Sequence, residues 1–357
     1  MKLFALELGN RQVKMLSEKG IKVYPSYFID SNEYGNRSIL NFAKNEENTS
    51  DYVSSLDMDF TYVWGKKLDI SNRHITDTIA FTDRYDSLEF LLLTDFALAE
   101  MARDFKQATN GELEVVVITG IPSIEYEQNE IVAKVQTSLK GKHTVFIDDT
   151  EYNILVKHVY VLTQTTGTAI DAMVNEFGNI IDDNDIEDNY IGIVDAGGGT
   201  VIVDAFNNMN LDTNNRLQLE EGAHALYSAI RNAVTLLGHK ITDYEVERLL
   251  RQNSVSEQYQ WSPNKRDFLD LTEIVMRERK RYTRKIATAV KTTLKSIAKM
   301  KVVYVTGGTA NLLIKEEFKR VIPIAWFVIG SETANVRGFY KYGLANGVTG
   351  IEEESTH

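Results

Sequence analysis

The sequence predicts an α/β protein built from two related domains, and three observations support this fold class. An apolar strand ends at Asp195, is followed by three glycines, and resumes as a strand after Thr200. A similar pattern occurs near the N-terminus, where an apolar strand ends at Glu7 and a second begins after Gly9 and Asn10. The chain has 357 residues, which is long for one hydrophobic core and sufficient for two.

The segment 191–206, IGIVDAGGGTVIVDAF, is typical of a strand, a tight turn and a second strand. Glycines adopt positive φ and carry no Cβ, so the N–H groups of Gly197, Gly198, Gly199 and Thr200 can close around a phosphate. Asp195, at the end of the strand, is placed to hold a phosphate-bound Mg²⁺ directly or through water. A glycine-rich turn alone is weak evidence, because most such turns only reverse the chain.

The segment 3–16, LFALELGNRQVKML, repeats this pattern. Aligning Glu7 with Asp195 places Gly9 on Gly197 and Asn10 on the next glycine. Glycine and asparagine both tolerate left-handed backbone, as a turn of this kind requires. Two hairpins that each carry a carboxylate, about one domain apart, therefore predict two related domains that bind one polyphosphate.

Composition excludes several classes of protein. The chain is 43% hydrophobic and 25% charged, as in ordinary globular proteins, and it has no cysteine. Disulfides, cysteine zinc sites and thiol nucleophiles are therefore excluded. The six histidines show no metal-ligand spacing. The N-terminal strand carries Glu7 and is not typical of a signal peptide, and the apolar helix within 88–105 is interrupted by acids, so we expect a cytoplasmic protein that does not contact membranes.

The net charge of −12 argues against DNA binding by the surface as a whole. Between Arg277 and Lys301, however, ten Lys and Arg residues accompany the single acid Glu278. A solvated helix face is the simpler interpretation of this basic segment, and we favour it.

The remaining elements follow from hydrophobic periodicity and from start and stop signals. A capping pattern at 86–89 predicts a helix to about residue 108, and the apolar run 113–122 predicts a buried strand ended by glycine and proline. Further strands are expected within 20–85 and 144–162. Helices are expected at 164–178, 219–238, from Thr242 or Asp243 onward, 267–298 and 334–346, and a strand, glycine turn and helix at 301–313.

Five motifs now stand in order: the first acid hairpin, the QTTGTA helix start at 164–169, the second acid hairpin, the VTGGTA turn at 305–310, and a small-residue helix at 334–346. This order resembles the nucleotide-binding core shared by actin, sugar kinases and the heat-shock chaperone ATPases. The resemblance covers the chain almost from end to end. It implies an actin-like two-domain α/β fold, in which each domain is a ribonuclease-H-like mixed sheet with helices and the nucleotide lies in a cleft between domains. Domain I would comprise 1–162 plus 335–357, and domain II 163–334.

Within that superfamily the chain is similar to the plasmid-segregating bacterial actins of the ParM type and their archaeal relatives. The similarity rests on three stretches: ELGNRQVK in the first loop, VVITGIPSIEY in the first domain, and the helix ANVRGFYKYG. The resemblance points to a homologue from a Gram-positive plasmid.

The resemblance implies a role for each matching residue. Asp195 and Glu7 would hold Mg²⁺ and take part in catalysis, and Gln164 would orient the attacking water, because an amide is too weak a base to take a proton. Lys14 would reach the phosphates; a solvent-facing lysine is the simpler alternative. The residues that would bind the ATP or GTP are Gly9, Asn10, Lys14, Gly197, Gly198, Gly199, Thr200, Gly307, Gly308 and Thr309.

Three assignments besides that of Lys14 carry an open alternative. The turn containing Gly307 would admit the base and ribose, or it needs glycine only for its own geometry. Gln164 could equally be a solvent-facing residue at a helix start. Glu7 departs from the aspartate usual in the family, and its extra methylene moves the carboxylate about 1.5 Å. That displacement either preserves a water-mediated metal contact or slows hydrolysis.

The resemblance also implies a mechanism and partners. Small residues, Gly167 and Ala169 on one helix and Ala334 and Gly338 on the other, would let two connecting helices cross closely. Nucleotide-driven closure would present surfaces for a head-to-tail filament of this chain. The filament would hold plasmid DNA through a centromere-bound adaptor of the ParR type, with no specific DNA binding of its own.

Three other functions compete with this one. A small-molecule kinase of the same superfamily would need an aspartate base, for which Asp148 or Asp149 is available. A chaperone would need a peptide-binding domain, and none is expected after residue 346. A non-motor scaffold that binds nucleotide weakly is the third.

Overall fold

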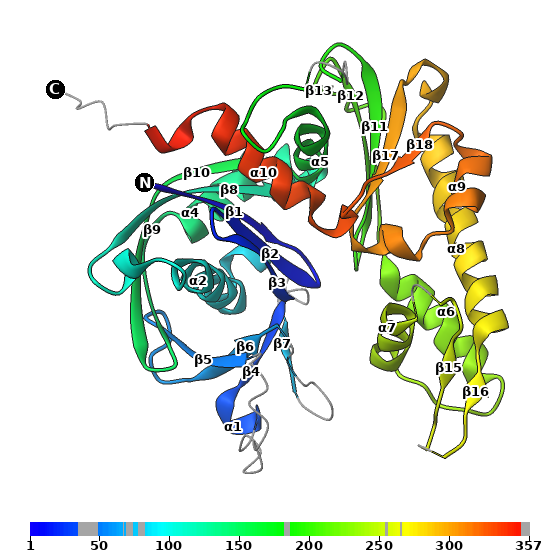
Figure 1. The fold of residues 1–357 in the computed structure, drawn as a ribbon, viewed down its shortest axis with the longest axis horizontal. Coiled ribbons are helices and arrows are strands. Elements are labelled where there is room, and N and C mark those ends of the chain that lie inside the picture. The colour runs from blue at the N-terminus through cyan, green and yellow to red at the C-terminus, as the bar shows by residue number, and fades with distance from the viewer. Residues whose placement is uncertain are drawn as a thin grey trace. The chain divides into compact units, whose positions relative to one another are not determined.

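The computed structural model describes residues 1–34, 49–66, 68, 74–77, 83–181, 186–253, 256–264 and 266–350. The chain forms two compact units, Met1–Asp182 with Asn335–His357 (the first unit) and Asp183–Ala334 (the second unit). Figure 1 shows the ribbon, and each unit is described by itself.

The first unit is a curved mixed sheet with helices on both faces (Figure 1). Its sheet has the order β3-β2-β1-β8-β10-β9-β5-β6-β4-β7. Strands β1, β8 and β10 run parallel, whereas β2 and β3 continue the sheet antiparallel. The strands are β1 (Lys2–Leu8), β2 (Gln12–Ser17), β3 (Gly20–Pro25), β4 (Tyr27–Asp30), β5 (Thr49–Ser54), β6 (Tyr62–Gly65), β7 (Thr76–Asp77), β8 (Leu113–Ile121), β9 (Gly141–Ile147) and β10 (Thr150–Thr163). The helices are α1 (Ser31–Tyr34), η1 (Arg84–Asp86), α2 (Leu88–Ala102), η2 (Lys106–Ala108), α3 (Ser123–Tyr126), α4 (Asn129–Leu139), α5 (Gln164–Met173), α10 (Ala334–Ala345) and η7 (Val348–Gly350).

Burial on both faces explains the continuous apolar runs of β1 and β8. Alternate residues of a strand point to opposite faces. Phe4 and Leu6 therefore pack into the core that contains α2, while Leu3 and Ala5 pack with Phe339 of α10. The apolar run 113–122, predicted to be a buried strand, is β8, and this prediction is confirmed.

The second unit repeats this plan with fewer strands. Its sheet has the order β13-β12-β11-β17-β18, in which β11, β17 and β18 are parallel and β12 is antiparallel to β11. The strands are β11 (Tyr190–Ala196), β12 (Val201–Asn207), β13 (Asn210–Leu211), β14 (Leu217–Leu219), β15 (Gln260–Trp261), β16 (Leu269–Asp270), β17 (Val302–Thr306) and β18 (Ala325–Phe327). The helices are α6 (Ala223–Thr235), α7 (Asp243–Gln252), α8 (Thr272–Thr293), η4 (Ile297–Lys299), η5 (Gly308–Leu312), α9 (Lys315–Val321) and η6 (Ser331–Thr333).

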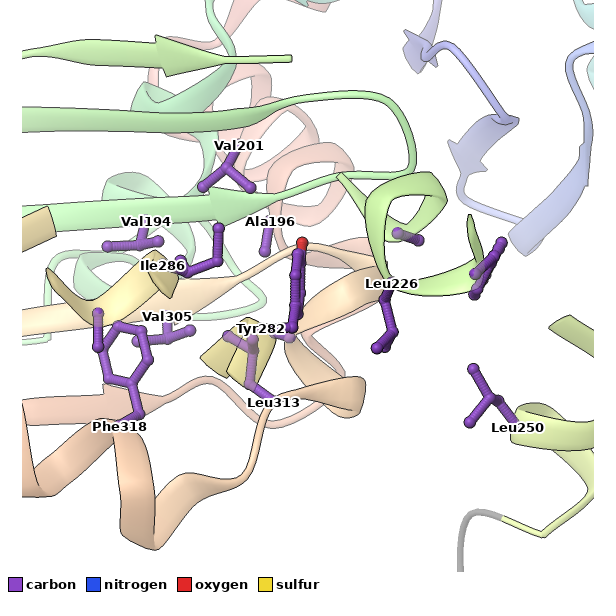
Figure 2. Close-up of a cluster of buried hydrophobic side chains, with 14 of the residues drawn as sticks. Val194, Ala196, Val201, Leu226, Leu250, Tyr282, Ile286, Val305, Leu313 and Phe318 are labelled. Atoms are coloured by element: carbon purple, nitrogen blue, oxygen red, sulfur yellow. The ribbon is translucent and has the colours of Figure 1, made fainter. Parts of the chain in front are cut away.

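One hydrophobic cluster joins the sheet of the second unit to its helices, and Figure 2 shows part of it. Val194 and Val201 of the hairpin pack in the same cluster as Ile286 of α8 and Leu226 of α6. The strand ends that carry Asp195 and Thr306 are thus fixed by a core that extends under both helices. This fixed frame determines where the loops at those strand ends lie.

The shared strand order confirms the predicted ribonuclease-H-like sheet in each unit. β3-β2-β1-β8-β10 corresponds to β13-β12-β11-β17-β18, with the acid hairpin at the same place in both. The boundary predicted at residue 162 lies before α5, whereas the contacts of the chain group α5 with the first unit. The reason is local, since α5 packs on β8, β10 and α10.

For two helices, the predicted first residue lies a few positions before the residue at which the helix begins in the structure. The helix expected from residue 219 begins at Ala223, because Leu217–Leu219 pairs with β12 as β14. The helix expected over 267–298 covers only Thr272–Thr293, because Leu269–Asp270 pairs with Gln260–Trp261. In both cases pairing with a distant strand overrides the local helical pattern. By contrast, the start of α7 agrees with the prediction. Thr242, one of the two predicted caps, forms a complete capping box there.

Across the described ranges, no helix combines the length and the apolar character that a membrane-spanning segment needs.

Candidate functional site

Glu7 lies at the end of β1 in a small polar group of the first unit. It is paired across the hairpin with Lys14, whose Nζ is 3.0 Å from Oε1 of Glu7. Gln164, the first residue of α5, donates from Nε2 to the same oxygen at 3.2 Å. The structure therefore brings together three residues that the sequence assigns to phosphate chemistry, although Gln164 is 157 positions from Glu7.

The second carboxylate oxygen of Glu7 fits a metal or a metal-bound water. Glu7 is 3% exposed, and its Oε2 is buried with no hydrogen-bond partner in the described part of the chain. A buried charged oxygen without a partner is costly. A hard anionic oxygen is also the ligand that Mg²⁺ prefers. The glutamate therefore fits the expected ion despite its extra methylene.

The contact with Glu7 also fixes the orientation of the Gln164 amide. A carboxylate accepts hydrogen bonds and does not donate, so the NH₂ group of Gln164 faces Glu7 and its carbonyl oxygen is turned away. Thr163 caps the helix, its hydroxyl accepting from the N–H of Thr166 at 3.3 Å, and this holds Gln164 at the first turn. Within the described residues this carbonyl oxygen has no donor, so it can accept a hydrogen bond from a water.

Asp195 occupies the matching position of the second unit, at the end of β11. It pairs with Ile202 on one side and Thr306 on the other, and it is 5% exposed. The registers of the two hairpins are identical: Glu7 pairs with Lys14 and Leu8 with Val13, as Asp195 pairs with Ile202 and Ala196 with Val201. The predicted alignment of Glu7 with Asp195 and Gly9 with Gly197 is therefore present in the structure.

The first turns of both loops close in the same way. The N–H of Gly9 donates to the carbonyl of Gln12 at 3.1 Å, and the N–H of Gly197 donates to that of Thr200 at 2.8 Å. A Cβ on Gly9 would lie 2.9 Å from the Gln12 oxygen, so a side chain here would crowd the turn. Glycine at this position follows from the tightness of the turn.

The second loop offers three of the four backbone donors that the sequence predicts, because the N–H of Gly197 is occupied by the carbonyl of Thr200. Its carbonyls are occupied: Gly199 accepts from the N–H of Gly222 at 2.9 Å, and Gly198 from that of His224 at 3.3 Å. Among the residues that the structure describes, the N–H groups of Gly198, Gly199 and Thr200 donate no hydrogen bond. Successive backbone donors of this kind are what an anion-binding loop needs.

Gly222, at the start of α6, is a functional candidate that the sequence analysis missed. A Cβ there would lie 2.5 Å from the carbonyl oxygens of Gly197 and Gly198, so only glycine lets the helix approach the loop. The available signal was a glycine directly before an amphipathic helix. It was overlooked because the helix was expected to begin at residue 219.

The VTGGTA turn lies against Asp195. Gly307 has φ +87°, and a Cβ on it would overlap the Asp195 carboxylate and the Ala196 carbonyl. The Thr309 hydroxyl donates to the carbonyl of Gly197 at 2.7 Å. Gly308 begins the short helix η5. The geometry of the turn therefore requires glycine at position 307. The turn also supports the second loop through the bond from Thr309 to Gly197.

The described ranges contain no group of three or more His, Asp or Glu side chains that could hold a metal ion by themselves. Each of the two carboxylates, Glu7 in the first unit and Asp195 in the second, instead suits a cation that takes most of its ligands from phosphate oxygens and water.

The two aspartates available to a kinase lie far from Glu7. Asp148 and Asp149 form the turn between β9 and β10, before Thr150, whereas Gln164 follows the other end of β10. Fourteen residues of strand separate them, a distance on the order of 40 Å at about 3.3 Å per residue. Neither aspartate can act as a base beside Glu7.

The basic helix α8 forms ion pairs within its own unit. Arg284 lies 2.9 Å from Glu317 and Lys285 lies 2.6 Å from Glu221, while Arg281 pairs with Glu278 at 3.1 Å. All three side chains remain more than half exposed, so the helix face is solvated as well as paired. Much of the apparent excess of positive charge is therefore neutralised locally.

Comparisons with known proteins agree with this geometry. The family model described as "Actin like proteins N terminal domain" matches residues 5–167, and that described as "Alp7A C-terminal domain" matches residues 190–325. No curated protein sequence matches the chain.

Three solved structures are similar along almost their whole length. The apo ParM protein of psk41 is 24% identical with a TM-score of 0.74, covering 98% of this chain and 99% of that one. An archaeal actin homologue in complex with ADP is 16% identical with a TM-score of 0.71, covering 95% and 98%. A subunit of a 15-stranded ParM filament from Clostridium botulinum is 17% identical with a TM-score of 0.72, covering 96% and 98%. At these identities the likeness shows a common actin-like fold.

Proposed function

Because this chain belongs to the actin-like proteins, we propose that it is a nucleoside triphosphatase that polymerises with ATP or GTP and segregates plasmid DNA. The observation that carries the proposal is the pair of acid hairpins with one register, Glu7 in the first unit and Asp195 in the second. One nucleotide contacts both hairpins. A similar structure that contains ADP supports nucleotide binding by this fold.

The phosphates are bound by the two loops and Lys14. The N–H groups of Gly198, Gly199 and Thr200, which donate to no other described residue, donate to phosphate oxygens. Lys14, whose ammonium group donates to Glu7, brings a positive charge to the same loop and attracts the phosphates. Gly307, Gly308 and Thr309 form the turn that the base and ribose approach. The loops recognise polyphosphate, which ATP and GTP share.

Hydrolysis uses Glu7, Asp195 and Gln164. Mg²⁺, when bound with the nucleotide, would neutralise charge on the phosphate oxygens, and Glu7 and Asp195 are the residues that would hold it. Gln164 orients the attacking water through its free carbonyl oxygen, because its NH₂ group is committed to Glu7. Orienting the water and donating to Glu7 are both hydrogen-bonding roles, and neither requires Gln164 to accept a proton.

Crossing of α5 and α10 links nucleotide binding to polymerisation. A Cβ on Gly338 would overlap the carbonyl of Gly167, so the two helices touch through their backbones. Asp171 of α5 also forms ion pairs with two residues of α10, accepting from Arg337 at 2.5 Å and from Lys341 at 2.7 Å. Contacts this close transmit rotation of one helix to the other.

Assembly is head-to-tail, and the cargo is attached through an adaptor. Structures of filaments built by similar proteins support self-association. The ion pairs of Arg284 and Lys285 with acids of their own unit leave little unbalanced charge for DNA. A ParR-type protein on a plasmid centromere is therefore the partner that binds DNA, and the filament works in the cytoplasm.

Light scattering together with phosphate release tests the function. Adding ATP or GTP with Mg²⁺ to the purified chain should raise the scattering, and the signal should fall as phosphate release reaches completion. In the Asp195→Ala variant the scattering should rise and persist, because the loop N–H groups still bind phosphate while hydrolysis is lost. Glu247→Gln on α7, where Glu247 pairs with Arg251, is the matched control. Phosphate release without any change in scattering would contradict the filament, and no release would contradict the enzyme.

A further inference from the structure

One arginine, Arg84, contacts the loop of the first hairpin although it lies more than seventy positions away in the sequence. Arg84 donates from Nη1 to Oδ1 of Asn10 at 2.7 Å, and from Nη2 to the carbonyl of Leu8 at 2.8 Å. A longer contact of 3.3 Å joins Nη2 to the carbonyl of Gly9. A single guanidinium therefore contacts three consecutive residues of the loop.

The surroundings of Arg84 fix its position. It begins η1, and its Cζ lies 5.3 Å from the centroid of the Phe90 ring and 5.8 Å from that of Tyr85. The Tyr85 hydroxyl in turn donates to Glu125. Burial lowers the pKa of Arg84 from its ordinary value, although arginine stays charged at neutral pH. Hydrogen bonds from a charged group in such surroundings are strong and directional.

The chemistry of the contact determines which way Asn10 faces. A guanidinium has donors and no acceptor, so the Asn10 atom beside it is the carbonyl oxygen. The NH₂ group of Asn10 must then be turned away from Arg84. In the described ranges this NH₂ group has no hydrogen-bond partner. Two N–H donors of Asn10 are thus available in the described structure, while the carbonyls of Leu8 and Gly9 are directed to Arg84.

We propose that Arg84 is a positioning residue for the first loop, which directs the NH₂ group of Asn10 toward a phosphate of the bound nucleotide. The inference rests on the proposed function, because it requires that the loop binds phosphate. It adds a side-chain donor to the backbone donors of the hairpin. It also explains why an asparagine stands here, where the second loop has Gly198.

A lysine could not replace Arg84 in this role. Three acceptors on Leu8, Gly9 and Asn10 lie around one planar fork, whereas an ammonium group is a compact point charge on a flexible stem. The Arg84→Lys variant keeps the charge and loses the fork. It therefore separates the effect of positioning from the effect of net charge.

The test first measures the equilibrium binding of MgATP and MgGTP to the wild-type chain. The nucleotide that binds more tightly is then titrated into full-length variants. Arg84→Lys and Asn10→Ala should each weaken binding roughly ten-fold, as expected for loss of a hydrogen bond to a charged group. Adding Arg84→Lys to Asn10→Ala should cost only about two-fold more, because the amide to be positioned is already gone. Arg103→Lys is the control, since Arg103 lies in the same unit and donates to Ser50 instead.

A second variant keeps the inference testable if Arg84→Lys does not fold. Asn10→Asp should retain the thermal stability of wild type, because a carboxylate still accepts from Arg84. It should nevertheless weaken triphosphate binding about ten-fold or more, because an oxygen replaces the NH₂ group that faces the phosphate. Binding of the nucleoside alone should not change.

The outcomes separate this inference from the function on which it rests. If wild type binds neither MgATP nor MgGTP, the proposed function fails. If wild type binds and the variants of Arg84 and Asn10 bind equally well, Arg84 has no positioning role. Full additivity of Arg84→Lys and Asn10→Ala would also overturn it, because the two residues would then act independently.

Discussion

The two acid hairpins share one register, yet their loop carbonyls are held in different ways. In the first hairpin the carbonyl of Gly9 accepts from the Ser26 hydroxyl at 2.6 Å and from Arg84 at 3.3 Å. In the second, the carbonyl of Gly197 accepts from the N–H of Ala223 at 3.2 Å and from the Thr309 hydroxyl at 2.7 Å. The carbonyl of Gly9 is therefore held by side chains, and that of Gly197 by a side chain and by the backbone at the start of a helix.

This difference determines how each loop can be broken. Removing a side chain is enough to release the carbonyls of Leu8 and Gly9, because their donors are the side chains of Arg84 and Ser26. The backbone donors of the second loop cannot be deleted by substitution. That loop is instead vulnerable where a Cβ would intrude, at Gly222 and Gly307. Support of a loop thus depends on side-chain donors in the first hairpin and on glycines in the second.

The largest effect is expected from neutralising the two carboxylates. Asp195→Asn and Glu7→Gln should each reduce phosphate release about 100-fold or more, since each removes an anionic ligand for the metal. The measurement is the steady-state rate with excess Mg²⁺ and nucleotide, with Glu247→Gln as control. A wild-type rate in either variant would contradict the equivalence of Glu7 and Asp195.

Gly307→Ala should destabilise the second unit strongly. The added Cβ would overlap backbone and carboxylate atoms, and φ +87° is unfavourable for alanine. The free energy of unfolding should fall by about 2–4 kcal/mol, measured by urea denaturation. Gly111→Ala is the matched control, because the nearest atom to its Cβ would be 3.9 Å away. Equal stability of the two variants would show that the turn has room to relax.

Glu7→Asp tests whether the extra methylene matters. The shorter side chain retracts the carboxylate about 1.5 Å from Lys14 and Gln164, which lie 3.0 and 3.2 Å from it. Phosphate release should change by less than about ten-fold in either direction, well short of the loss in Glu7→Gln. A rate in Glu7→Asp as low as that of Glu7→Gln would mean that the position, and not only the charge, is essential.

The smallest effect is expected from Ser26→Ala. It removes one hydrogen bond to the Gly9 carbonyl, which keeps its contact with Arg84. Stability should fall by about 1 kcal/mol, and the nucleotide dissociation constant should rise by about two- to five-fold. Titration of the nucleotide and thermal unfolding measure the two quantities. A larger loss of binding than in Arg84→Lys would make Ser26, and not Arg84, the main support of the first loop.

The hairpins could be predicted because their signals are local. Apolar strands that end in Glu7 and Asp195 and continue after a short turn lie within fifteen or so residues, so the pattern itself predicts the register. The order of the five motifs then predicted the actin-like fold. Strand and helix periods reflect burial that each segment achieves in the final sheet.

The supports of the loops could not be predicted, because they depend on contacts distant in sequence. Nothing near Arg84 indicates that it will meet Leu8, 76 positions away. The start of α6 was missed for the same reason, since Leu219 pairs with Val201 across the sheet and cannot belong to the helix. Gly222 therefore stood inside the predicted helix and gave no signal of its contact with the loop.

The central claim is that both hairpins bind one nucleotide, and calorimetric titration of the triphosphate tests it most directly. Wild type should bind one nucleotide per chain. Lys14→Met in the first unit and Gly222→Ala in the second should each weaken that same binding about ten-fold or more, with the stoichiometry unchanged. Two independent sites, or an unchanged affinity in either variant that remains folded, would contradict the account.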